Sequence, residues 1–287
     1  MSGAAANATD GGRAIGAIVW KSIVWVLTGL FVLNLVLLVA SVALDSLAQR
    51  WLGTWLPVGY TADWYASAWN EFQLPDVLIV TLEVVVAVLL ISAALGVPAA
   101  YALARRNFPG KRLVLFLFLL PLIVPPFTYG IPLASVLYQF GLGGTLGGVV
   151  LANLVPAVPF VIFVLVPFVE QIDPRVEAAA RVLGARTGPL FRHVLLPLLA
   201  PGILASLVLV LVRTIGLFDL TFLTSGPGTQ TLVVALYYAV FAPGVRANQS
   251  IDAMAVVYML ASLLCLLVAL RFVDPTQIVG RATRRAR

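Results

Sequence analysis

The sequence predicts an all-α membrane protein with six transmembrane helices and with both termini in the cytoplasm. Its composition, the spacing of its apolar runs and the placement of its positive charges support this prediction. Of 287 residues, 61% are hydrophobic and 10% are charged, and the mean hydropathy is +1.04. A water-soluble fold cannot bury so much apolar surface, whereas lipid accepts it.

The predicted spans follow the apolar runs, each near or above the ~20 residues that cross a bilayer. The runs cover residues 19–44, 76–104, 113–139, 148–168, 198–221 and 250–271. Around the transmembrane domain, 19–271, we expect a disordered N-terminus at 1–18 and a basic cytoplasmic tail at 272–287. Ser41-Val42-Ala43 also fits a cleavable signal peptide, but the first run is longer than a signal core, which favours a retained helix.

Positive charge sets the predicted orientation, because Lys and Arg are retained on the cytoplasmic side. With the N-terminus inside, 15 of the 18 Lys and Arg residues fall in interior segments. Arg50 and Arg246 are exterior, and Arg213 lies within a span. The net charge of +6 therefore reflects topology and contact with membrane lipid, and gives no indication of nucleic-acid binding.

Two regions have unusual composition. The exterior segment 45–75 is rich in aromatic residues, namely Trp51, Trp55, Trp64, Tyr65 and Trp69. Such residues favour a belt at the membrane interface over direct contact with solute. The third and fourth spans carry seven prolines between Pro121 and Pro167. Broken helices are tolerated only where they line a protein or water cavity, so we expect these spans to line a pathway.

A polar island interrupts the apolar pattern at 169–197. Asp173 is a good N-cap, Pro174 suits the first helical position, and Glu177 lies near the positive end of the helix dipole. Ala178, Ala179 and Ala180 favour a slim helix that Gly184 ends. A second segment then runs from Thr187 to Leu196-Pro197. The alternative is an amphipathic helix lying on the membrane surface.

This island resembles the EAA loop of permease subunits in type I, binding-protein-dependent ABC importers. The family pattern is Glu-Ala-Ala, three residues, Gly, nine residues, Ile, one residue, Leu-Pro. Here Ala179, Ala180, Gly184, Val194, Leu196 and Pro197 occupy the matching places, and the resemblance extends over about residues 70–271. The glutamate place holds Ala178, and Glu177 is one position early, about 100° around a helix. A salt link made by the family's glutamate is therefore in doubt.

The resemblance implies a division of labour. Two permease subunits, here expected to be paralogues, pair around a pathway, and each docks its loop on an ATP-binding cassette subunit. A solute-binding protein delivers solute from outside. The chain has no Gly-x-x-x-x-Gly-Lys-Ser/Thr loop, so we expect no ATPase activity and no cofactor of its own, with ATP bound by the partner. The expected location is a bacterial-type plasma membrane.

Four ionisable residues within or near the spans are candidates for the pathway or its gate: Glu83, Arg213, Asp219 and Asp252. Counted from the exterior ends of their spans, Glu83 and Arg213 lie at similar depth, which predicts a pair between helices. Asp219 and Asp252, nearer the exterior mouth, are better placed to meet solute.

The solute is the least determined part of the prediction. Tyr60–Tyr65, Leu120–Pro126 and Gly226–Leu232 resemble the spermidine/putrescine branch, and exterior acidic residues suit a polycation. We therefore favour polyamines weakly, with sugar import as the alternative.

An intramembrane enzyme is a remote alternative. Gly216-Leu217-Phe218-Asp219 resembles part of the Gly-x-Gly-Asp element of aspartyl membrane proteases, with Asp252 as the second carboxylate. The second glycine and a Tyr-Asp are missing, and no other catalytic motif occurs. The single cysteine, Cys265, lies in an apolar run, and no metal site is predicted.

Overall fold

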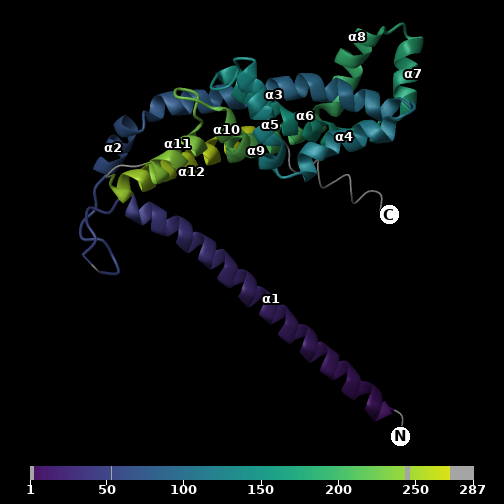
Figure 1. The fold of residues 1–287 in the computed structure, drawn as a ribbon. Coiled ribbons are helices and arrows are strands. Elements are labelled where there is room, and N and C mark those ends of the chain that lie inside the picture. The colour runs from purple at the N-terminus through teal and green to yellow at the C-terminus, as the bar shows by residue number, and fades with distance from the viewer. Residues whose placement is uncertain (1–2, 53, 243–245, 272–287) are drawn as a thin grey trace. The chain divides into compact units, whose positions relative to one another are not determined.

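The computed structural model describes residues 3–52, 54–242 and 246–271 (Figure 1). These residues form helices joined by irregular segments, and none of them belongs to a β-strand element. Contacts divide the chain into two units: Met1–Ser67 with Arg246–Val256, and Ala68–Val245 with Val257–Arg287. The elements in chain order are α1 (Gly3–Asp45), α2 (Asp63–Glu71), α3 (Leu74–Arg105), α4 (Lys111–Ile123), α5 (Pro126–Gln139), α6 (Leu146–Gln171), α7 (Pro174–Val182), α8 (Thr187–Leu190), the π-helical η1 (Phe191–Leu195), α9 (Leu196–Ile215), α10 (Phe218–Thr224), α11 (Leu232–Phe241) and α12 (Asn248–Arg271).

The first unit consists mainly of α1 and the segment that follows it. Helix α1 begins at Gly3, whereas the sequence predicted no regular structure for residues 1–18; several alanines there favour a helix. After α1, an antiparallel bridge joins Ala48 and Tyr60, and the Trp64 indole donates a 2.8 Å hydrogen bond to the Ala48 carbonyl. Trp55, in contrast, is fully exposed. The predicted tail, 272–287, lies outside the described residues.

The second unit is built on the packing of α3 against α6, with α9 against both. Its core is made of aliphatic side chains such as Val84, Val88, Val161 and Leu165. The two helices approach closely at Gly96, where an added Cβ would lie 2.6 Å from a methyl carbon of Val161. Small residues of this kind let membrane helices pack at short distance.

Among the described residues, five helices are long and apolar enough to cross a membrane, and a bent pair raises the number to six, in agreement with the predicted architecture. The pair is the third predicted span, in which α4 and α5 meet at an angle of 100°. The break falls at Val124-Pro125, both in extended conformation. Prolines at 125 and 126 explain it, since a proline disfavours helical geometry in the residue before it and donates no hydrogen bond.

The fourth span corrects a prediction. Helix α6 runs from Leu146 to Gln171 without a break, although it contains Pro156, Pro159 and Pro167. Pro156 and Pro159 are buried. Helix α6 packs against α3 and α9 in the core, where protein surroundings tolerate prolines within a membrane helix, and it is not a broken segment.

The fifth span also differs from the predicted residues 198–221. Helix α9 continues directly from the preceding loop, so the apolar span covers Thr187–Ile215, and it ends at Ile215. Gly216 and Leu217 then separate it from the short helix α10. Because the helix ends six residues early, Arg213 lies in its last turn and not deep within it.

Candidate functional site

The loop between α6 and α9, residues 172–195, contains the predicted helix and its caps. Asp173 accepts a hydrogen bond from the backbone N–H of Arg175 at 2.9 Å, and Pro174 is the first residue of α7. Gly184 has a φ of +85°, a left-handed conformation in which a glycine ends a helix at low cost. In Figure 1, α7 and α8 lie at one end of the long helices α3 and α6.

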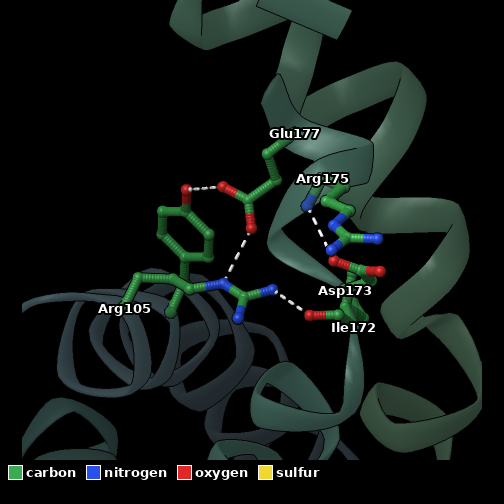
Figure 2. Close-up of polar contacts among 6 residues, drawn as sticks. Arg105, Ile172, Asp173, Arg175 and Glu177 are labelled. Atoms are coloured by element: carbon green, nitrogen blue, oxygen red, sulfur yellow. Dashed lines mark hydrogen bonds and ion pairs between the residues drawn. The ribbon is translucent and has the colours of Figure 1, made fainter. Parts of the chain in front are cut away.

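Glu177 points back into the protein and not outward (Figure 2). Its carboxylate accepts a 2.7 Å hydrogen bond from Arg105 Nε and a 2.6 Å hydrogen bond from the Tyr101 hydroxyl. Arg105 Nη2 also donates to the Ile172 carbonyl at 2.6 Å. We call these four residues the anchor cluster. It joins the last turn of α3 to the end of α6 and to α7.

The anchor cluster is shielded from solvent, since the side chains of Arg105 and Glu177 are 16% and 10% exposed. A charged pair in such surroundings is stabilising only when its hydrogen-bonding groups are satisfied, as they are here at both carboxylate oxygens. Removing one partner would leave a nearly buried charge, which costs about 2–4 kcal/mol. The contact therefore fixes α7 to α3 far more firmly than an exposed ion pair would.

A second contact holds the part of the loop that follows α7. The Tyr101 ring meets the Phe191 ring edge-on, with centroids 6.2 Å apart. Beneath them Val169, Leu190, Leu195 and Leu199 form a buried apolar cluster, against which Ala180 and Val194 pack. Tyr101 thus contacts α7 through its hydroxyl and η1 through its ring.

The opposite side of α7 and its C-cap are exposed and, apart from Arg175, apolar. Val182 and Leu183 are 86% and 88% exposed, and Ala178 and Ala179 are also exposed. We call these four residues the outer face. At the start of α9, Leu196 and Pro197 are exposed as well. Large aliphatic side chains so fully open to solvent, outside the long apolar helices, mark a surface for contact with another protein or with the membrane.

Sequence reasoning missed Tyr101 and Arg105. Arg105 was counted only among the interior positive charges that set the predicted orientation. Its partner Glu177 is 72 residues away in the chain, so no local pattern joins the two. The available signal was a tyrosine and an arginine four residues apart, on one face at the end of the second span. The glutamate at 177 does form a salt bridge, within this chain, despite its displaced position in the motif.

Of the four intramembrane candidates, Asp252 belongs to the first unit, and the three in the second unit form no ion pair with one another. Glu83 is exposed on α3, Arg213 and Asp219 are half-buried on α9 and α10, and Asp252 is half-buried on α12. The predicted pair between Glu83 and Arg213 is not formed: within the described residues, no ion pair or hydrogen bond joins the two side chains. Arg213 instead lies over the Phe160 ring, 5.9 Å from its centroid.

A bundle of membrane-spanning helices with a helical loop that presents an apolar outer face is typical of a transport permease. The sequence matches the family "Binding-protein-dependent transport system inner membrane component" over residues 92–279. This chain therefore belongs to that family and is a permease subunit of an ABC importer.

Individual relatives differ in the solute they are named for. Over 201 residues the chain is 37% identical to the molybdenum transport system permease protein ModB of Haemophilus influenzae, covering 64% of this chain and 88% of that one. It is 34% identical over 160 residues to the trehalose transport system permease protein SugB of Mycobacterium tuberculosis, covering 56% and 58%. A bacterial ABC transporter involved in the import of the acidic polysaccharide alginate has a similar fold, with a TM-score of 0.75, 18% identity and coverage of 90% and 98%.

Proposed function

We propose that this permease subunit receives mechanical work from a separate ATP-binding subunit through the outer face of α7 and transmits it to α3 through the anchor cluster. The observation that carries the proposal is the division of α7 into two faces. Val182 and Leu183 are open to a partner, while Glu177 is bonded to Tyr101 and Arg105. A push on the outer face would thus reach the end of a span of 32 residues.

The division of labour follows from this arrangement. The chain supplies one half of the translocation pathway, and a second permease, expected to be a paralogue, supplies the other. Two ATP-binding subunits hold the ATP, since the sequence has no phosphate-binding loop. A solute-binding protein delivers the solute, as the family description implies. The loop and both termini face the cytoplasm, which the distribution of Lys and Arg supports.

The pathway is proposed to run along the bent pair. Thr128, Ser135 and Gln139 are exposed polar residues on α5, although α5 is half of a membrane span. Polar side chains on an exposed span face favour water over lipid as the neighbour. Arg213 and Asp219, with Glu83 and Asp252, remain proposed pathway or gating residues.

For the solute we propose a small polar molecule, either an oxyanion or a sugar. This proposal replaces the preference for polyamines drawn from the sequence. The relatives reported above are named for molybdenum, which dissolves in neutral water as an oxyanion, and for trehalose. Neither name supports a polycation. Sugar import thus stays as the second candidate.

Co-purification tests the coupling proposal. The tagged chain, extracted in mild detergent from its native membrane, should bring an ATP-binding subunit with it. Leu183→Asp, which places a carboxylate on the outer face, should abolish this association without unfolding the chain. Phe108→Asp is the matched control, because Phe108 is also exposed in a loop next to the anchor-cluster end of α3. Association that survives Leu183→Asp but not Phe108→Asp would contradict the proposed docking surface.

A further inference from the structure

Arg213 is a charged group for which the described residues provide no hydrogen-bond acceptor and no carboxylate partner. It lies in the last turn of α9 and is half-buried. Its guanidinium carries five N–H donors. Within the described part of the chain it makes no hydrogen bond and no ion pair, and its contact is with the Phe160 ring.

The surroundings of Arg213 come from three other elements. Phe160 lies on α6, Tyr129 on α5 and Asp219 in the first turn of α10. Asp219 forms no ion pair with Arg213. The Tyr129 hydroxyl donates a 3.4 Å hydrogen bond to the Pro121 carbonyl. No carboxylate among the described residues pairs with the guanidinium, so its donors stay open.

The elements around Arg213 are fixed to one another. Gly130 of α5 faces Leu220 and Leu223 of α10, where an added Cβ would lie 2.8 Å from a methyl carbon. The amide of Asn153 on α6 donates a 3.1 Å hydrogen bond to the Thr221 hydroxyl on α10. Helix α10 is thus fixed against both α5 and α6. These elements include half of the bent pair, which is the proposed lining of the pathway.

A half-buried guanidinium whose N–H donors have no acceptor among the described residues favours an anion or water as its neighbour. A charged side chain within a span usually faces a partner or a water-filled path. The planar guanidinium fits carboxylates and tetrahedral oxyanions through two parallel hydrogen bonds, and an aromatic ring behind it holds the plane while leaving its edge free. A neutral sugar has no charge that could pair with the guanidinium in this way.

We propose that the Arg213 guanidinium, backed by Phe160 and without a partner among the described residues, contacts the anionic group of the transported solute. This inference rests on the proposed function and sharpens it, because it selects an anion over a neutral sugar or a polycation. The same chemistry could be supplied by the phosphate of a lipid headgroup, so the test must separate the two sources.

Chemical modification of arginine reads the contact directly. The assembled importer, in lipid nanodiscs, is treated with phenylglyoxal, and modification of each arginine is measured by mass spectrometry. Arg213 should react, and molybdate or galacturonate should protect it while trehalose does not. With the probe at about ten times its Kd, modification should slow about tenfold. Arg106, an exposed arginine outside the spans, is the internal control and should react equally under all conditions.

The other outcomes overturn the proposal. If Arg213 reacts without protection by either anion, no anionic solute group meets it. If it is unreactive in discs of phospholipid but reactive in discs of galactolipid, which has no phosphate, the lipid is its partner. If it is unreactive in both, the group is closed to anions. A failure of the proposed function is distinguishable, because then no ATP-binding subunit co-purifies, whatever Arg213 does.

Discussion

Arg105 and Arg213 are the same residue type in two regions of one unit, and their surroundings differ in one respect. Arg105 finds a carboxylate and a carbonyl oxygen within its own chain. Arg213 finds an aromatic ring and no acceptor among the described residues. A charge whose donors are satisfied internally holds structure together, whereas a charge with open donors requires something from outside. The comparison separates an anchoring role from a proposed binding role.

The largest expected effect comes from breaking the anchor cluster. Glu177→Ala leaves Arg105 without its carboxylate, so we expect a loss of about 2–4 kcal/mol in stability and nearly complete loss of solute uptake. Thermal unfolding in detergent and uptake by proteoliposomes measure the two effects. Glu170→Ala, at an exposed carboxylate near the end of α6, is the control and should change neither.

Arg213→Gln should separate the two arginines. Losing a charge-assisted contact of about 1.5–3 kcal/mol, made only with solute, should lower uptake about tenfold to a hundredfold. Stability should change little, because no internal partner is left unpaired. Arg105→Gln should lower both. If Arg213→Gln destabilised the chain as much as Arg105→Gln does, the contrast between the two sites would be wrong.

Gly184→Ala should have a smaller effect on the anchored loop. Nothing lies within 4 Å of an added Cβ, so the cost is that of a left-handed backbone, about 1–2 kcal/mol. Gly188→Ala is a matched control, since it too has open space but no positive φ, and it should be neutral or slightly stabilising. Equal effects of the two substitutions on thermal unfolding would argue against the turn at Gly184.

Tyr101→Phe should have the smallest effect. It removes the hydroxyl that donates to Glu177 and keeps the ring against Phe191. A loss of about 0.5–1.5 kcal/mol is expected. Tyr101→Leu, which removes the ring contact as well, should cost more in the same unfolding assay. If the two substitutions lowered the stability equally, the ring contact with Phe191 would contribute nothing to the stability.

The sequence was informative wherever the signal is local. The N-cap at Asp173, the proline at the start of α7 and the left-handed glycine at 184 depend on neighbouring residues, and all three were predicted. The break at Pro125-Pro126 has a local cause as well. Such features follow from backbone sterics and from donors within one turn of a helix.

Features that depend on distant packing could not be read in this way. The partner of Glu177 is fixed by the packing of α3 and α6, and no nearby residue points to Arg105. The prediction of a Glu83–Arg213 pair rested only on the depth of the two residues in the membrane. It failed because Glu83 lies on the exposed side of α3 and because α9 ends at Ile215, six residues before the predicted end.

The central claim is that α7 moves with α3 as one body. Spin labels at Ala94, on the exposed side of α3, and at Arg175, on α7, would report their separation in the assembled importer by electron paramagnetic resonance, with Cys265 replaced by serine. The account predicts the same narrow distance distribution with and without ATP, broadened by Glu177→Ala. A distance that shifts with ATP in the otherwise native chain would contradict it.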